Sequence, residues 1–284
     1  DYVSSMSAEG LLRRCESYEQ GICPEGVLLL TQGVDCQIDR LEVSTWGWGK
    51  GEEAFLIDHV QLWGDPHQAE VWKQLQIVIN QQYKHENGKS LVPVMSAIDS
   101  GGLHTSEVYQ FTREKVAQGV IAIKGQSQAN KPVIGRPSRV DINFRKINKA
   151  IQKGGLVYPL GVDTIKNTLM GRLKNNKIGS DGYIHFHADT SEEYFKQITS
   201  ERQILKTNRA GFQVPQWVLP NNVRNECLDC FVYSYAAMCL YISPYNRNTV
   251  WQQLENKFNE GDKVVKPKRA TIKPNTNNNF VNSW

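Results

Sequence analysis

The sequence predicts an α/β fold in which a central β-sheet is covered by helices on both faces. Strand-like and helix-like segments alternate along the first two thirds of the chain. Several of the strand-like segments are short continuous apolar runs, which are typical of strands buried on both faces. In such sheets ligands bind beyond the carboxyl ends of the strands, so we expect the functional residues there.

The first half of the predicted sheet is a hairpin with a third strand beside it. These three strands are expected at residues 27–37, 41–49 and 54–63. The second strand alternates apolar and polar side chains, as a half-buried strand does, and the chain turns over between the first two at residues 38–40. Pro66 then opens a helix over residues 67–82, whose apolar face is formed by Val71, Leu75, Val78 and Ile79.

Two further buried strands flank a second helix. Residues 91–98 form a buried strand that ends at Asp99, and a helix begins near Thr105, a plausible N-cap. Residues 120–123 form the next strand, which ends at Lys124. The elements expected after it are a helix (162–174), a short strand (183–187), a helix start (190–193), two paired strands (198–205 and 212–218) and a strongly apolar helix (222–241).

Composition and domain organisation fit one large core. The chain has 284 residues, 40% of them apolar, and a net charge of +4, which permits a nucleic-acid partner without demanding one. No apolar run is long enough to cross a bilayer, and six irregularly spaced cysteines indicate free thiols in a reducing compartment. We expect a lead-in at residues 1–26, the main domain at 27–245 and a flexible tail at 246–284, which is rich in Lys and Asn towards its end.

Three acids interrupt or adjoin apolar elements. Asp35 follows the first strand, Asp99 follows the fourth, and Asp229 lies inside the last apolar helix. Charged residues are rarely buried without partners, so each needs an explanation. Carboxylates that converge at the end of a sheet form an oxygen cage suited to Mg²⁺ or Mn²⁺, and a pair of such ions can hydrolyse a phosphodiester. Each acid alone is weak evidence for such a site, and Asp35 alone is better explained as a turn residue that caps the end of a strand.

The middle of the chain, residues 126–161, is basic and punctuated by Gly and Pro. Its charges suit either a solvated loop with an exposed strand or a surface that contacts phosphates. If it contacts DNA, the candidate residues are Lys124, Lys131, Arg136, Arg139, Arg145 and Lys146.

Several short blocks resemble the C-terminal nuclease domain of the large terminase subunit of tailed bacteriophages, in its lambda-like branch. The blocks are 33–37 with 39–42, 46–53 with 56–58, 98–102, 123–125 and, most specific, 224–233, which reads RNECLDCFVY. Together they span roughly residues 27 to 241. The resemblance implies a ribonuclease H-like fold and a metal-dependent endonuclease that cuts concatemeric viral DNA during packaging.

Carried over to this sequence, the resemblance makes Asp35, Asp99 and Asp229 the ligands of two Mg²⁺ or Mn²⁺ ions. Glu226, one turn before Asp229, is a possible further ligand. The implied partners are double-stranded DNA, a small terminase subunit and the procapsid portal, in the host cytoplasm and without a membrane. The phosphate-binding loop of an ATPase motor does not occur in this sequence, so the lead-in would continue from a missing ATPase domain.

Most of the other polar residues that could bind metal or phosphate are better explained by structural roles. Cys227 and Cys230 lack the second pair that a zinc site needs and are expected to pack in the core. His185 and His187 fit a polar strand edge, and His104 fits a helix surface better than a contact with the scissile phosphate. Lys124 could neutralise a phosphate or form a strand-end salt bridge. We expect Glu42, Glu52 and Glu53 to be exposed.

Two classes of function remain open at this point. The first is a two-metal DNA endonuclease, in which Asp35 bridges the ions while Asp99 and Asp229 complete separate coordination spheres. The second is a non-catalytic nucleic-acid-binding or assembly module of the packaging machine, in which the acids are structural and the basic middle and the tail bind the partner.

Overall fold

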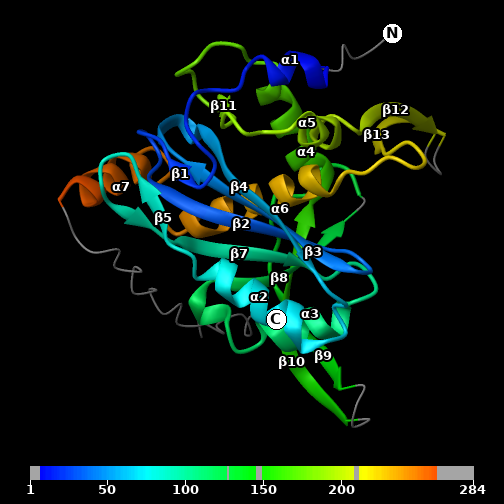
Figure 1. Ribbon diagram of the computed structural model, residues 1–284. Coiled ribbons are helices and arrows are strands. Elements are labelled where there is room, and N and C mark those ends of the chain that lie inside the picture. Colours follow the sequence, from blue (N-terminus) through cyan, green and yellow to red (C-terminus); the bar gives the residue numbers. More distant parts are fainter. Residues whose placement is uncertain (1–6, 127, 145–148, 208–210, 261–284) are drawn as a thin grey trace, which may run out of the picture.

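A mixed eight-stranded sheet forms the centre of the computed structural model, which describes residues 7–126, 128–144, 149–207 and 211–260 (Figure 1). In spatial order its strands are β11 (Ile184–His185), β4 (Ala54–Trp63), β3 (Arg40–Trp48), β2 (Leu29–Cys36), β7 (Pro93–Asp99), β8 (Val120–Gln126), β10 (Lys149–Gly161) and β9 (Ser138–Phe144).

The strand directions divide the sheet at β2. Strands β2, β3 and β4 are antiparallel neighbours, as the hairpin pattern predicts. On the other side of β2, strands β7, β8 and β10 run parallel to it, and β9 pairs antiparallel with β10 at the edge. An antiparallel meander continued by parallel strands beside its first member is the strand order of a ribonuclease H-like fold, so the predicted fold class is confirmed.

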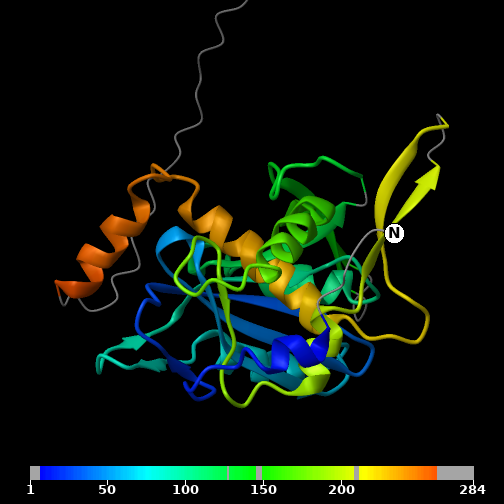
Figure 2. The ribbon, with the colours of Figure 1, turned by 90° about the horizontal axis from the view of Figure 1, so that it is seen from above.

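Helices cover both faces of the sheet (Figures 1 and 2). One face packs against α6 (Glu226–Ile242), α4 (Val162–Leu173), α5 (Glu192–Ile198) and α1 (Ala8–Leu12), which share one large apolar cluster. The other face packs against α2 (Ala69–Ile79) and α3 (Thr105–Thr112), which share a second cluster. Both clusters are continuous with buried strand residues, so the sheet is the middle layer of three.

Smaller elements decorate this core. Strands β1 (Ile22–Cys23), β5 (Tyr83–His85) and β6 (Ser90–Leu91) form a separate sheet, and β12 (Arg202–Thr207) pairs with β13 (Gln213–Val218) in the predicted hairpin. Two 3₁₀ turns, η1 (Lys50–Glu52) and η2 (Val116–Gln118), lie in the connections. No helix in the described part of the chain is long and apolar enough to span a membrane.

The expected flexible tail contains a helix that the sequence pattern did not predict. Helix α7 (Val250–Asn259) begins inside it and buries Val250 and Trp251 against the main cluster. An ion pair of 2.6 Å between Lys50 Nζ and Glu255 Oε2 also ties the helix to the body of the protein. Two buried residues at the start of a polar helix are too few to produce a clear apolar period. The rest of the expected tail, from residue 261, lies outside the described residues.

The start of α3 also differs from the prediction. The N-cap position is His104, whose side chain makes no capping hydrogen bond. Thr105 Oγ instead donates hydrogen bonds of 2.8 Å to the carbonyl oxygens of Ser100 and Gly102, so it braces the turn that follows β7.

Candidate active site

The acids Asp35 and Asp99 lie at the same edge of the sheet. Asp99 is the last residue of β7 and Asp35 is the next-to-last residue of its parallel neighbour β2. Val34 pairs with Ile98, so each acid is the next residue along its strand. Asp35 is buried, and Asp99 is half-buried beside the end of β8, where it pairs with Ile123. Both acids therefore lie at the carboxyl ends of their strands, as the sequence pattern predicts.

Helix α6 brings Asp229 to the same edge because it lies directly on β2. Thr31, Gly33 and Asp35 alternate along β2 and so point to one face of the sheet. Thr31 Oγ1 is 2.8 Å from both the carbonyl and the hydroxyl oxygen of Ser234. Two residues of strand advance about 6.6 Å, and four residues of helix advance about 6 Å. Every second residue of β2 therefore lies opposite about every fourth residue of α6.

Gly33 sets how closely the helix approaches. A Cβ atom at this position would lie 1.8 Å from the carbonyl oxygen of Cys230 and 2.8 Å from the backbone nitrogen of Ser234. Only a residue without a side chain allows this contact. The stacked rings of Trp46 and Phe231, with centroids 3.7 Å apart, hold the same part of α6 on the neighbouring strand.

The electrostatics show that the three acids are neighbours. Burial raises the pKa of Asp35 well above its usual range, and the charges of Asp229, Asp99 and Glu226 add to the rise, while a hydrogen bond from Gln37 opposes it. Tyr233 is buried one turn beyond Asp229 on α6. Burial raises the pKa of its phenol, and the charges of Asp229, Asp99 and Asp35 raise it further.

Each acid is also oriented by a hydrogen-bond donor. Gln37 Nε2 donates to Asp35 Oδ2 at 2.6 Å. The backbone nitrogen of Gly101 donates to Asp99 Oδ1 at 3.0 Å. Asn225 Nδ2 donates to Asp229 Oδ2 at 2.9 Å, so all three carboxylates are held by the chain.

Lys166 and Glu201 belong to this site, although sequence reasoning did not find them. Lys166 Nζ, on α4, lies 2.6 Å from Glu201 Oε1 and 3.5 Å from Asp229 Oδ1, and all of these groups are largely buried. Burial raises the pKa of Asp229 to about 6, although Lys166 opposes the rise. In the sequence Lys166 is one more polar residue on an amphipathic helix, and only the packing of α4 on α6 makes it part of the site.

The donor atoms suit a hard divalent cation. All of them are carboxylate oxygens, which are the ligands of Mg²⁺ and Mn²⁺. The three acids do not meet at one point: across the described ranges, the only three potential ligand atoms within 4.8 Å of one another come from His67, His104 and Glu107. The looser grouping is compatible with two ions about 3.5–4 Å apart, whose outer ligands bind different ions.

Glu226, the possible fourth ligand, has other partners. Its Oε1 lies 3.0 Å from Arg40 Nη2, and Arg224 Nε is 3.2 Å from both of its carboxylate oxygens. The same two arginines bind Glu42 on β3, which stands opposite Asp35 in the sheet. Glu226 therefore belongs to a buried ion-pair network at the side of the acid cluster.

The expectation that Glu42 is exposed was wrong. Its side chain is fully buried, and it accepts hydrogen bonds from His59 and Gln61 in addition to the arginines. Burial alone would raise the pKa of Glu42, but the bonds from His59 and Arg40 lower it to about 2. The arginine that completes this network is far away in the sequence, so strand alternation could not reveal it.

The predicted DNA-binding residues fall into three groups. Lys124 is exposed at the end of β8, where its charge lowers the pKa of Asp99 against the effect of burial. Arg136 and Arg139 are exposed before and along β9, and Lys131 is half-buried. Arg145 and Lys146 lie outside the described residues.

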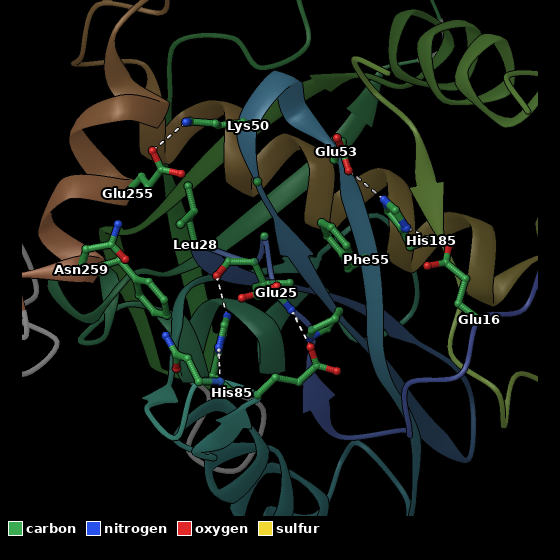
Figure 3. Close-up of a pocket in the computed structure, with 17 residues that line it drawn as sticks. Glu16, Glu25, Leu28, Lys50, Glu53, Phe55, His85, His185, Glu255 and Asn259 are labelled. Atoms are coloured by element: carbon green, nitrogen blue, oxygen red, sulfur yellow. Dashed lines mark hydrogen bonds and ion pairs between the residues drawn. The ribbon is translucent and has the colours of Figure 1, made fainter. Parts of the chain in front are cut away.

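A cavity of about 680 Å³ is separate from the acid cluster. It is lined by Val27 and Leu28, just before β2, so it lies roughly 23 Å from Asp35 along the strand. Figure 3 shows that its walls carry glutamates. Such a surface repels phosphates, so its charge suits DNA less well than that of the exposed Lys124, Arg136 and Arg139 does.

His185 and Glu53, which line this cavity, were expected to form a polar edge and to be solvated, as were the nearby His187 and Glu52 in the sequence. His185 lies between two carboxylates, with its ring nitrogens 2.8 Å from Glu16 Oε1 and Glu53 Oε2 (Figure 3). His185 and His187 are buried, and Glu52, also buried, pairs with Arg172 and Arg247. The expectations for His185, Glu52 and Glu53 were therefore wrong, because each pairs with a charged group from a distant segment. The expectation for His187 was also wrong, because it is buried, although its Nδ1 makes no hydrogen bond among the described residues.

Cys227 and Cys230 pack in the core, as predicted. Both thiols are buried on α6, and Cys230 Sγ donates a 3.3 Å hydrogen bond to the carbonyl oxygen of Glu42. Burial raises the pKa of both thiols, which keeps them protonated.

Comparison with known proteins identifies related sequences. The chain is 32% identical over 222 residues to the terminase large subunit of Enterobacteria phage P21, which covers 76% of this chain and 33% of that protein. It is 33% identical over 244 residues to the terminase large subunit of Escherichia phage lambda, which covers 83% of this chain and 36% of that protein. The chain thus spans about a third of the length of these curated relatives.

Solved structures give weaker matches. A mutant nuclease domain of the large terminase subunit gp2 of bacterial virus Sf6, with manganese, matches 74% of this chain and 88% of that chain, with a TM-score of 0.41 and 9% identity. The nuclease domain of the large terminase g2p of bacteriophage SPP1, with bound Mn, matches 76% and 95%, with a TM-score of 0.32 and 12% identity. A family model described as the endonuclease domain of terminase large subunit gpA matches residues 1–251. The chain therefore belongs to the family of terminase large subunit endonuclease domains.

Proposed function

We propose that this domain is a metal-dependent endonuclease that cuts concatemeric viral DNA during packaging, with Asp35, Asp99 and Asp229 as the ligands of two Mg²⁺ or Mn²⁺ ions. The observation that supports this most is the convergence of the three carboxylates, each partly or fully buried, at one edge of the sheet. Such a concentration of negative charge is costly unless cations offset it.

The proposal assigns metal-ligand roles to the three aspartates and positioning roles to the residues around them. Asp35, from the central strand, would be the ligand shared by the two ions, and Asp99 and Asp229 would each hold one of them. When bound, such ions activate a water molecule and stabilise the leaving oxygen of the phosphodiester. Gln37, Asn225 and Lys166 act as positioning residues, because they fix the orientation of the ligand carboxylates.

The DNA would lie over the edge of the sheet that carries the acids. Lys124 is exposed beside Asp99 and can neutralise a phosphate there. Arg136 and Arg139 extend the positive surface toward β9. Contacts of this kind set register and affinity without reading sequence, so any choice of cutting site would come from other parts of the terminase.

The domain organisation and the partners of the full-length protein are proposed from the family to which the chain belongs. The nuclease unit comprises residues 27–245 together with α1 and α7, which bury Leu11, Val250 and Trp251 in the same apolar cluster, and the lead-in at 1–26 would connect it to an ATPase domain. Its partners are double-stranded DNA, a small terminase subunit and the procapsid portal, and it works in the host cytoplasm.

Nicking of a supercoiled plasmid tests the proposal. The chain should nick the plasmid with Mn²⁺ or Mg²⁺ and stop when EDTA is added, and Asp35→Asn should lower the rate at least about 100-fold. Asp58→Asn is the matched control, because Asp58 is a similarly buried acid of the same sheet that hydrogen-bonds Gln20 and Tyr83 instead.

The opposite outcomes favour a non-catalytic binding or assembly module. They are an absence of nicking with either metal, or undiminished nicking by Asp35→Asn. A gel-shift assay on the same samples separates the two functions, since a binding module would still retain the plasmid after Asp35→Asn.

A further inference from the structure

Two histidines and a glutamate converge on the face of the sheet opposite to α6. His67 lies in the loop before α2, and His104 and Glu107 lie in the first turn of α3 (Figure 1). One ligand atom from each residue lies within 4.8 Å of the other two. His104 and Glu107 are three residues apart on one helix, so their side chains share a face.

His104 is the unusual member of this cluster. It is 4% exposed, and neither of its ring nitrogens makes a hydrogen bond of normal geometry. Buried polar atoms nearly always have partners, so this imidazole, which has only a poorly aligned contact with the backbone of Gln37, needs an explanation such as a bound ion or water. The ring of His67 faces it, with the two centroids 4.6 Å apart.

We propose that His67, His104 and Glu107 form a second metal site, separate from the acid cluster, that binds a zinc-like transition-metal ion. Two imidazoles and one carboxylate are a donor set that binds Zn²⁺ with a fourth position left for water. The site differs in chemistry from the acid cluster, where all ligands are oxygens and a harder cation is expected.

The present arrangement needs only small changes to hold the ion. Ligands around a tetrahedral Zn²⁺ at about 2.0–2.1 Å lie roughly 3.4 Å apart, so atoms now within 4.8 Å must close by up to about 1.4 Å, while the His67–Glu107 pair must open slightly. His67 Nδ1 is now 2.9 Å from Glu107 Oε1, and the ion would take the place of the proton between them. Burial and the nearby charge of His67 lower the pKa of His104, which favours the neutral imidazole that binds metal.

The ion would join two segments next to the acid cluster. His104 follows Asp99 by five residues, within the turn that Thr105 braces. His67 belongs to the connection between β4 and α2. A metal bond between them would fix the start of α3, and through it the turn after β7, against the neighbouring helix. The proposal is independent of the nuclease proposal, because it uses none of the same ligands.

Metal binding to the Asp35→Asn variant of the full chain tests the site, because this background weakens binding at the acid cluster. Zn²⁺ and Co²⁺ are added separately to metal-free protein and followed by equilibrium dialysis, with the visible absorption of Co²⁺ as the second readout. A four-coordinate Co²⁺ with imidazole ligands absorbs far more strongly than a six-coordinate ion among oxygens. We expect one strongly bound Zn²⁺ per chain, an intense Co²⁺ spectrum and a rise in melting temperature with Zn²⁺.

Three variants in the same background locate the ligands. His67→Gln changes a partly exposed side chain, so the fold should survive, and it should weaken Zn²⁺ binding by about 100-fold or more. Glu107→Gln should do the same and abolish the intense Co²⁺ spectrum. Glu70→Gln is the matched control, because Glu70 is an exposed acid at the start of α2 that pairs only with Lys73 among the described residues.

Two results would overturn the proposal. One is Zn²⁺ binding by His67→Gln as tight as that of its parent, and the other is a weak, six-coordinate Co²⁺ spectrum in the parent itself. If His104→Gln does not fold, His67→Gln and Glu107→Gln still decide the question. A failure of the zinc site would leave plasmid nicking by the wild-type chain unchanged, so the two proposals fail separately.

Discussion

The substitution Gly33→Ala tests whether the close packing of α6 on β2 positions the carboxylates of the candidate active site. A Cβ atom at this position would lie 1.8 Å from the carbonyl oxygen of Cys230, whereas ordinary contact begins at 3.4 Å. The obstacle is helix backbone, which cannot rotate away as a side chain can. The helix must therefore retreat by about 1.6 Å, the difference between these distances.

The cost of this retreat can be worked from the contacts that it breaks. Overpacking a close contact destabilises by about 1–3 kcal/mol. The two polar contacts of Thr31 with Ser234, both 2.8 Å, would be lost at about 0.5–1.5 kcal/mol each. The free energy of unfolding should fall by about 2–6 kcal/mol, from a total that is typically 5–15 kcal/mol. Displacement of Asp229 by an ångström or more should also lower metal-dependent nicking by about 100-fold.

Urea denaturation followed by circular dichroism measures the first effect, and plasmid nicking under conditions where the variant is folded measures the second. Gly171→Ala is the control, because a Cβ atom on this exposed position of α4 meets nothing within 4 Å and alanine favours a helix by up to about 1 kcal/mol. A Gly33→Ala protein with the stability and nicking rate of the wild type would refute the account of how α6 is held.

Two further predictions concern buried carboxylates. Without divalent metal, the stabilising contribution of protonated Asp229 is fully present below about pH 4 and is lost as the pH rises through its raised pKa of about 6, because the folded state holds this proton more tightly than the unfolded chain. In urea denaturation between pH 4 and 8, Asp229→Asn should therefore gain stability relative to wild type as the pH rises, and a constant difference would contradict this. Glu42→Gln should lower the free energy of unfolding by about 3–5 kcal/mol, because it leaves Arg40 buried without that carboxylate. Glu70→Gln, on an exposed pair, should change it by less than about 0.5 kcal/mol, and equal effects of the two substitutions would argue against the buried network.

Most of the sheet and most helices were predictable because their patterns are local, whereas β9 and β10 lie in the stretch that was expected to be a basic loop with an exposed strand or a phosphate-binding surface. Strands β2, β3, β4, β7 and β8 and helices α2, α4 and α6 coincide with predicted segments, to within a few residues at their ends. Each of them has a clear period or a continuous apolar run. Helix α7 lacks such a signal, because only Val250 and Trp251 are buried and the rest of it is polar.

Buried charge was the least predictable feature, because its partners are distant in the sequence. Glu42 is neutralised by Arg224, 182 residues later. Asp229 is held by Lys166 from another helix, and His104 faces His67 across two elements. The three aspartates could be singled out because each interrupts an apolar segment, whereas Lys166 and Glu201 occupy positions where a polar residue needs no explanation.

The electrostatics of the acid cluster provide a physical reason why it should bind cations. The chain supplies Lys166 and Lys124 near the three aspartates, but Glu201 adds a further negative charge beside Asp229. The result is that burial and mutual repulsion raise the pKa of Asp35 and of Asp229 in spite of these lysines. A proton relieves this imbalance at low pH, and a divalent cation can relieve it at neutral pH without protonating a ligand. Competition between protons and metal at the same carboxylates should therefore make metal affinity rise steeply between about pH 5 and 7, with a smaller rise in Asp229→Asn, where one of the competing protons is absent.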